Sequence, residues 1–132
     1  MLRLALAVGA LAAVAVGLWH LQAATTGIEV TELRVGQIPA TVFAPASAGP
    51  APVVVIAHGF AGSQQLMQPF ALTFARNGYR AVTFDFPGHG RNPQPLPGGL
   101  ADDAASSRAL LGALDEVVAA ARRQRQPLIL GK

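Results

Sequence analysis

Two short segments combine histidine with glycine, and both follow an apolar run. They are HGFAGS (residues 58–63) and DFPGHGRN (residues 85–92). Gly59 has no Cβ to obstruct a ligand, so a reacting group can approach the backbone closely at this point. An unpaired N–H of Phe60, at the end of a strand and before a helix, is suited to stabilise a developing oxyanion. The first segment therefore indicates a site for a negatively charged oxygen.

Other kinds of site fit these residues less well. The chain has no cysteine, which excludes a disulfide framework, a thiolate metal site and a cysteine nucleophile. His58, Asp85 and His89 are metal-binding residue types, but their spacing fits no zinc pattern, so we expect both histidines to be structural and no metal or cofactor to bind. The formal net charge of +3 comes without a basic stripe interleaved with aromatics, which predicts no nucleic-acid partner.

The runs before these segments predict strands of a parallel sheet. PVVVIAH (residues 52–58) and YRAVTFDF (residues 79–86) are rich in β-branched and aromatic residues, as is typical of strands covered on both faces. Between them Ser63 is a candidate N-cap, and Asn77 with the following glycine is a stop signal, so a helix is predicted. The residues expected on its buried face are Leu66, Met67, Phe70, Ala71 and Phe74.

The remaining segments complete the predicted order of elements. IEVTEL (28–33) and ATVFAP (40–45) predict an antiparallel strand pair connected near residues 35–37. A helix from Asp102 is followed by QPLILGK (126–132), which predicts a last buried strand. The apolar face expected for this helix consists of Leu110, Leu111, Leu114, Val117, Val118 and Ala121. The fold class is therefore α/β, a strand pair followed by parallel β-α-β-α-β with right-handed crossovers.

The first 24 residues predict a membrane segment. No charged residue occurs from Leu4 to Ile28, and the run to Ala24 reaches the roughly 20 residues that span a bilayer core. Because a signal-peptide core is usually shorter, we expect an uncleaved anchor over residues 1–24 that binds the membrane through residues 4–24. Arg3 then favours a domain, residues 25–132, on the extracytoplasmic side. A cleaved signal peptide, giving a secreted protein, is the alternative.

Taken together, these segments resemble the α/β-hydrolase superfamily over residues 28–132. PVVVIAHGFAGS is similar to its third strand and the loop that begins the oxyanion hole, and FDFPGHGRN to its fourth strand and Asp-x-x-Gly-His-Gly loop. The second helix and QPLILGK are similar to its αB helix and fifth strand. The resemblance implies that Phe60 donates its backbone N–H to the oxyanion. It implies that the substrate-binding loops are shaped by His58, Gly59, Asp85, Gly88, His89 and Gly90.

In that family the fifth strand leads into the nucleophile elbow, Gly-x-Ser-x-Gly, and the acid and histidine of the triad come later. Gly131 matches the first glycine of an elbow, and the four serines, Ser47, Ser63, Ser106 and Ser107, lack flanking glycines. The resemblance therefore implies the truncated N-terminal part of a serine hydrolase that acts on an ester, lipid or peptide-like acyl bond. We expect this chain alone to be inactive.

Two other functional hypotheses remain open. An aspartate at the elbow, as in dehalogenases, would keep the fold and change the chemistry. A non-catalytic, membrane-tethered module would instead bind a ligand or partner, with the edge of the last strand accepting a strand from another chain. In either case the open apolar edge predicts poor solubility of residues 25–132 in isolation.

Overall fold

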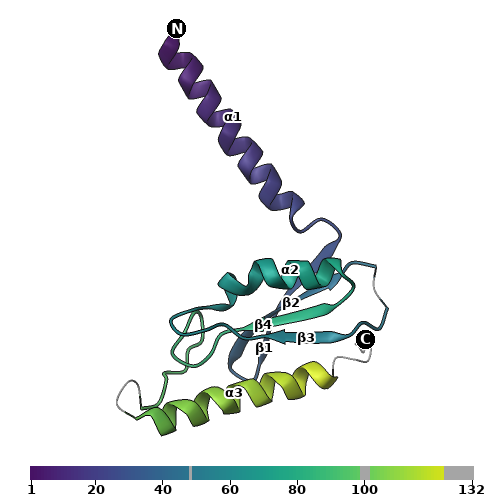
Figure 1. Cartoon of the computed structure of the whole chain (residues 1–132), viewed down its shortest axis with the longest axis vertical. Coiled ribbons are helices and arrows are strands. Elements are labelled where there is room, and N and C mark those ends of the chain that lie inside the picture. The colour runs from purple at the N-terminus through teal and green to yellow at the C-terminus, as the bar shows by residue number, and fades with distance from the viewer. Residues whose placement is uncertain (48, 99–101, 124–132) are drawn as a thin grey trace.

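The computed structural model describes residues 1–47, 49–98 and 102–123 (Figure 1). In chain order the elements are helix α1 (Leu2–Ala23), strands β1 (Ile28–Val35), β2 (Ile38–Pro45) and β3 (Val53–Ile56), the 3₁₀ helix η1 (Gln64–Met67), helix α2 (Gln68–Arg76), strand β4 (Arg80–Phe84) and helix α3 (Asp103–Arg123). The predicted element types and their order are confirmed up to α3. The strand expected from QPLILGK lies outside the described residues.

The strands form one mixed sheet in the order β1-β2-β4-β3. β1 and β2 are an antiparallel hairpin in which Ile28 pairs with Pro45 and Val35 with Ile38, so the predicted strand pair is confirmed. β2 is antiparallel to β4, and β3 is parallel to β4. The structure thus confirms an α/β fold with the parallel β3-α2-β4 unit that brings two strand ends to one edge of the sheet.

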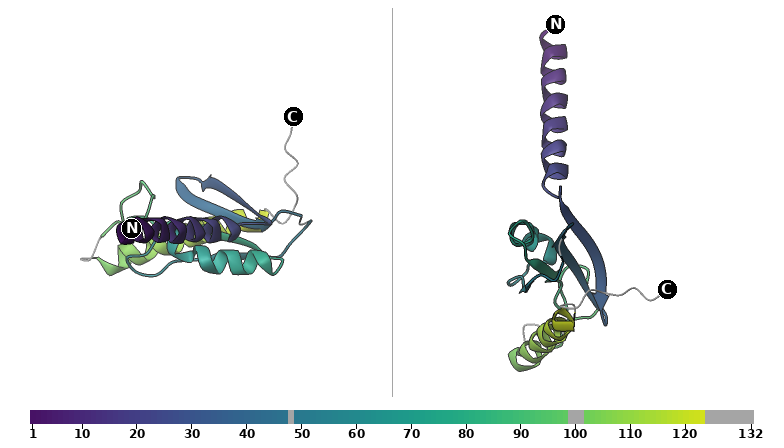
Figure 2. Two further views of the ribbon diagram at one scale, coloured as in Figure 1. Left: turned by 90° about the horizontal axis from the view of Figure 1, so that it is seen from above. Right: turned by 90° about the vertical axis from the view of Figure 1, so that its right-hand side faces the viewer.

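Helices cover both faces of this sheet, α2 on one side and α3 on the other (Figures 1 and 2). Successive residues of β4 alternate between the two layers, because side chains of a strand point to opposite faces. Val82 and Phe84 pack against the α3 side, whereas Ala81 packs against the α2 side. Residues buried with them are Ile38, Ala40, Val42, Ala113, Val117 and Ala121 under α3, and Phe43, Ala71, Leu72 and Ala75 under α2.

The predicted buried face of the first domain helix is wrong. Ala71 is buried as expected, but Leu66 and Phe70 are 62% and 59% exposed, and Phe74 is 37% exposed. The segment begins as a 3₁₀ helix and becomes an α-helix at Gln68, and the change in residues per turn breaks the phase that a single helical spacing assumes. The residues that contact the sheet are small ones and Leu72, which lets α2 lie close to the strands.

The face predicted for α3 is confirmed in part. Val117 and Ala121 are buried, and Leu114 packs against the same core. Leu111, however, is 61% exposed, and Ala113 takes a buried position that the prediction did not assign. Asp102 precedes the helix, and its carboxylate accepts a hydrogen bond from the Ala105 N–H at 2.9 Å, as an N-cap does.

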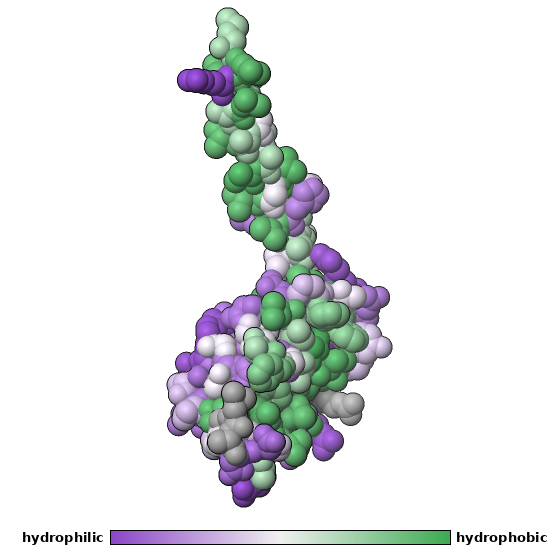
Figure 3. Space-filling view, turned by 60° about the vertical axis from the view of Figure 1, so that its left-hand side comes forward, coloured by the Kyte–Doolittle hydropathy of each residue, from purple (hydrophilic) through white to green (hydrophobic). Residues whose placement is uncertain are grey.

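Helix α1 projects from the domain as an apolar rod (Figure 3). None of its 22 residues is buried. Within the described residues it is the one helix that is long and apolar enough to cross a membrane, judged by length and composition. A signal sequence meets the same criterion.

The observed orientation of α2 predicts different losses of stability for substitutions at Leu72 and at Phe70. Leu72→Ala empties a buried position and should lower the free energy of unfolding by about 3 kcal/mol, whereas Phe70→Ala removes a mostly exposed ring and should cost below about 1 kcal/mol. Urea unfolding of the full chain in detergent micelles, followed by circular dichroism, measures both. A larger loss for Phe70→Ala would restore the helical face predicted from sequence.

Candidate functional site

A pocket of about 290 Å³ opens where β3 and β4 end. It is enclosed by the HGFAGS loop, the loop after β4 and the beginning of α3, at the edge of the sheet where α/β proteins bind ligands. Its lining residues are His58, Gly59, Phe60, Phe86, His89, Leu96, Asp103, Ser106 and Leu110. Four of the predicted site residues, His58, Gly59, Phe60 and His89, are therefore brought together around one space.

Phe60 lies at the tip of a tight turn beside this pocket. The N–H of Gly62 donates to the carbonyl oxygen of Gly59 at 3.1 Å and closes the turn. Ala61 follows Phe60 with φ 53°, the one positive φ of a non-glycine residue in the part of the chain that the structure describes. Left-handed backbone costs an alanine roughly 1–2 kcal/mol, and such strain concentrates at functional sites.

The backbone N–H of Phe60 is available to a ligand. Across residues 1–47, 49–98 and 102–123, this N–H donates no hydrogen bond, and the Phe60 side chain is 88% exposed. A Cβ added to Gly59 would meet nothing within 4 Å, so the absence of a side chain there leaves open space rather than relieving a clash. Within the described residues the Phe60 N–H thus has no protein partner, and the space beside Gly59 is open.

His58 fixes the start of this turn. Its ring is buried, and Nε2 accepts a hydrogen bond from the Phe86 N–H at 3.2 Å. In the neutral ring the proton must then lie on Nδ1, which donates to the carbonyl oxygen of Gly59 at 2.9 Å. Both ring nitrogens are therefore used to connect the end of β4 with the turn, which is the arrangement of a structural histidine.

His89 stands across the pocket from the turn. Its ring centroid is 5.2 Å from that of His58, and its Nδ1 lies 3.0 Å from the carbonyl oxygen of Pro87. Because a carbonyl only accepts, Nδ1 must carry the proton in this contact. Among the described residues no group of three His, Cys, Asp or Glu side chains is placed to hold a metal ion.

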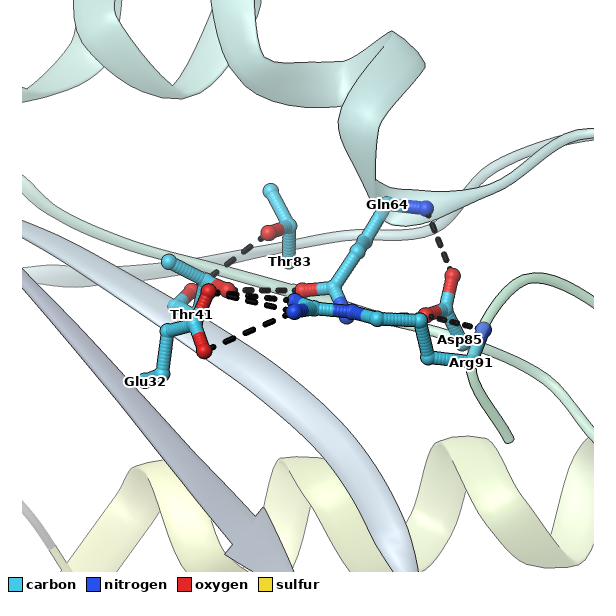
Figure 4. A network of polar contacts seen from close by, with 6 residues as sticks. All are labelled: Glu32, Thr41, Gln64, Thr83, Asp85 and Arg91. Carbon is cyan, nitrogen blue, oxygen red and sulfur yellow. Dashed lines mark hydrogen bonds and ion pairs between the residues drawn. The ribbon is translucent and has the colours of Figure 1, made fainter. Parts of the chain in front are cut away.

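Asp85 connects the start of η1 with the loop that follows β4 (Figure 4). It is fully buried, and its carboxylate accepts from the Gln64 N–H and the Gln64 Nε2, each at 2.8 Å, and from the Arg91 N–H at 3.0 Å. Gln64 is the first residue of η1, so this carboxylate caps the helix from a distant part of the sequence. Ser63 occupies the N-cap position, but its side chain makes no capping hydrogen bond.

The rest of the network in Figure 4 anchors the same loops to the sheet. Thr41 on β2 donates its hydroxyl to Gln64 Oε1 at 2.8 Å, and the Thr83 hydroxyl lies 3.4 Å from the Thr41 carbonyl oxygen. At the surface the Arg91 guanidinium pairs with Glu32 at 3.2 Å. Exposed pairs of this kind stabilise proteins little, so the buried amide and carboxylate are the stronger connection.

Gly88 and Gly90 lie in the loop after β4, where their backbone conformation and close contacts favour glycine. They have φ values of 75° and 52°, which disfavour any residue with a Cβ. A Cβ on Gly90 would collide with the Asp85 carboxylate, and one on Gly88 would come within 2.7 Å of the Leu96 Cβ. Neither glycine, nor the fully buried Asp85, lines the pocket. A role of these three residues in substrate binding stays a prediction.

The sequence reasoning missed the apolar wall of the pocket. Phe86 makes an edge-to-face contact with His58, with ring centroids 5.1 Å apart. Leu96 is the one aliphatic residue in the Pro- and Gly-rich segment 87–98, a signal that could have identified it. Leu110 was assigned to the core face of α3, although it faces the pocket near the start of that helix.

Comparison with known proteins identifies the family. Residues 48–131 match the family described as serine aminopeptidase, S33. This match covers more than half of the chain, and the chain therefore belongs to the S33 serine aminopeptidase family of α/β hydrolases. No curated protein matches the sequence of the chain.

Solved structures show that the fold is shared with other proteins. A putative lipase from Acinetobacter baumannii AYE is 25% identical with a TM-score of 0.52, over 78% of this chain and 33% of that protein. A putative dienelactone hydrolase from Klebsiella pneumoniae is 21% identical with a TM-score of 0.58, over 75% and 45%. A Thermus thermophilus protein is 24% identical with a TM-score of 0.56, over 76% and 44%. The chain thus spans less than half the length of these proteins.

The role of Asp85 can be tested by changing its charge without changing its size. Asp85→Asn replaces one carboxylate oxygen with an N–H₂ group that faces one or two of the three donors, and should lower the free energy of unfolding by about 2 kcal/mol or more. Asp102→Asn is the matched control, because asparagine is as good an N-cap as aspartate. Equal stability of the two variants in thermal unfolding would contradict the positioning role.

Proposed function

We propose that this chain supplies the oxyanion side of an acyl-hydrolase site, in a membrane-anchored serine hydrolase that cleaves an ester or related acyl bond. The observation that carries the proposal is the Phe60 N–H, which has no partner among the residues that the structure describes and lies beside an apolar pocket at the carboxyl end of β3. The family match and the likeness to proteins described as hydrolases and a lipase support it. The bound substrate is a small acyl compound or lipid.

The chemistry assigned to these residues is electrostatic. When a serine oxygen adds to the acyl carbon, the carbonyl oxygen becomes an oxyanion, and the Phe60 N–H donates to it. Expulsion of the alcohol or amine and attack by water on the acyl-enzyme then release the acid. Gly59 leaves room for the acyl group, while His58 and Asp85 hold the donor in place before the substrate arrives.

In the complete protein the serine, its histidine base and the acid that orients the base follow the part described here. An aspartate in place of the serine would instead displace a leaving group such as halide from an alkyl carbon and form an aspartyl ester. The Phe60 N–H would then donate to the oxyanion that forms when water attacks the carbonyl carbon of this ester and releases the alcohol. We infer that helix α1 is an uncleaved anchor and that the domain lies on the extracytoplasmic side; the length and apolar composition of α1 support the first part and Arg3 the second.

The catalytic proposal predicts that this chain and a longer protein that contains it differ in esterase activity and in labelling by a fluorophosphonate. None of the four serines of this chain lies in a Gly-x-Ser-x-Gly sequence, so the chain alone should neither hydrolyse p-nitrophenyl esters nor react with a fluorophosphonate probe. A protein that continues this chain through an elbow, an acid and a histidine should do both.

Two outcomes would contradict this. Turnover by the 132-residue chain that the fluorophosphonate abolishes would show a nucleophile elsewhere. Ligand binding without hydrolysis or labelling by the longer protein would favour the non-catalytic binding module.

The oxyanion role predicts a specific effect at Gly59. A Cβ at this position meets no protein atom, and Gly59 is not in the left-handed region, so Gly59→Val should fold normally. Its side chain would occupy the space in front of the Phe60 N–H and lower kcat of the longer protein by about a hundredfold. Gly112→Val, on the exposed side of α3, is the matched control and should leave kcat unchanged. Equal kcat values for the two variants would remove Gly59 from the site.

A further inference from the structure

Large apolar side chains are exposed along η1 and along the helix α2 that follows it. Leu66 on η1 and Phe70 and Phe74 on α2 are 62%, 59% and 37% exposed. Tyr79 extends the row, with its ring centroid 5.7 Å from that of Phe74 and 37% of its surface exposed. We call these four residues the α2 apolar row. Large apolar residues that gather on one exposed face mark an interaction surface.

The residues around the row carry little charge, which favours a membrane interface as the partner. From Gln64 to Tyr79 the sequence has no acidic residue, and Arg76 is its one charged side chain. The other polar residues of the segment are uncharged. An aromatic and aliphatic face with a tyrosine at one end and an arginine beside it has the composition of a surface that lies in a membrane interface.

The connection to α1 determines how far this face can be from a bilayer. Between the end of α1 and the start of β1 there are only residues 24–27, which span about 14 Å even when fully extended. They are not extended, because Thr25 and Thr26 donate their N–H groups back to the carbonyl oxygens of Gln22 and Ala23, each at 3.2 Å. A domain on such a short connection cannot move away from a membrane that holds α1.

The structure also fixes which side of the domain is next to α1. The Arg76 Nη2 donates to the Ala24 carbonyl oxygen at 2.7 Å. Ala24 and Ile28 pack against the core cluster that contains Ala71 and Ala75 of α2. Figure 1 accordingly places α2 on the side of the domain from which α1 projects, whereas α3 lies beyond the sheet. Of the two domain helices, α2 is therefore the one that contacts the residues next to the anchor.

We propose that the α2 apolar row docks onto the lipid bilayer that α1 enters, so that the domain lies against the membrane on its α2 side. This inference rests on the anchoring part of the proposed function, because a cleaved α1 would release the domain. Docking leaves the pocket beside Phe60, at the end of the sheet, close to the lipid surface. The partner is the bilayer interface, and contact with a second copy of the chain or with another protein would be a different result.

Site-specific labels can measure this contact, since the chain has no cysteine of its own. The full chain carrying Phe70→Cys is labelled with an environment-sensitive fluorophore and reconstituted in vesicles of phosphatidylcholine and phosphatidylglycerol. The matched control is Ala119→Cys, at an exposed position of α3 on the opposite face of the sheet. Because Phe70 is exposed, its replacement leaves the buried contacts of α2 intact, and Leu66→Cys provides a second label on the same row.

We expect the labels at positions 70 and 66 to show blue-shifted emission and loss of intensity with lipids that carry a quencher near the headgroup. The label at position 119 should show neither effect. Interfacial segments enter about 5–10 Å into the headgroup and acyl boundary, so a quencher deep in the acyl chains should act less strongly on positions 66 and 70.

The single tryptophan, Trp19 on α1, is an internal test of anchorage. Quenching of Trp19 without quenching at positions 66 and 70 would overturn the docking and leave the anchor intact. Absence of quenching at all three positions would overturn both. A blue shift that depends on protein concentration but not on lipid quenchers would assign the row to a protein contact and overturn the proposal. The esterase assay is independent of each result.

Discussion

The arrangement of the site depends on the hydrogen bonds that the buried Asp85 carboxylate accepts. A carboxylate removed from water is costly unless donors replace its hydration, and here two backbone N–H groups and the Gln64 amide do so. Within the described residues no Lys or Arg side chain pairs with it. Because the donors come from η1 and from the loop after β4, this one group fixes the two loops relative to each other. The Phe60 turn and the His89 loop therefore cannot shift independently.

The glycines and the strained alanine follow from the same constraint. Gly90 is required because its backbone lies against the Asp85 carboxylate with no space for a Cβ. The turn at Phe60 is held at its other end by His58, whose two ring nitrogens bond to backbone groups on either side of the pocket. Such fixed contacts allow Ala61 to remain at a positive φ, and a backbone donor held this way needs no rearrangement when charge develops.

Much of the fold was predictable because its signals are local. The β-branched run before HGFAGS, the hairpin register and the cap at Asp102 depend on periodicity and short-range hydrogen bonds. Four of the pocket residues, His58, Gly59, Phe60 and His89, also follow from position, since strand ends meet at one edge. The Asp85 contact to Gln64 was not predictable, because it joins residues 21 positions apart through a glutamine that carries no motif. The proposed roles in catalysis stay predictions, as does the membrane anchor.

The error at α2 shows why long-range context decides which face of a helix is buried. Spacing alone favoured Leu66, Phe70 and Phe74, the larger residues, but a helix that crosses a sheet closely needs small ones at the contact, here Ala71 and Ala75. Once these positions face the strands, the bulky side chains must point outward, although exposing them to water is unfavourable. The hydrogen bond from Arg76 to Ala24 holds the C-terminal end of α2 next to the base of α1. The proposed contact with the bilayer accounts for both apolar surfaces at once, and the sequence of neither segment considered alone points to it.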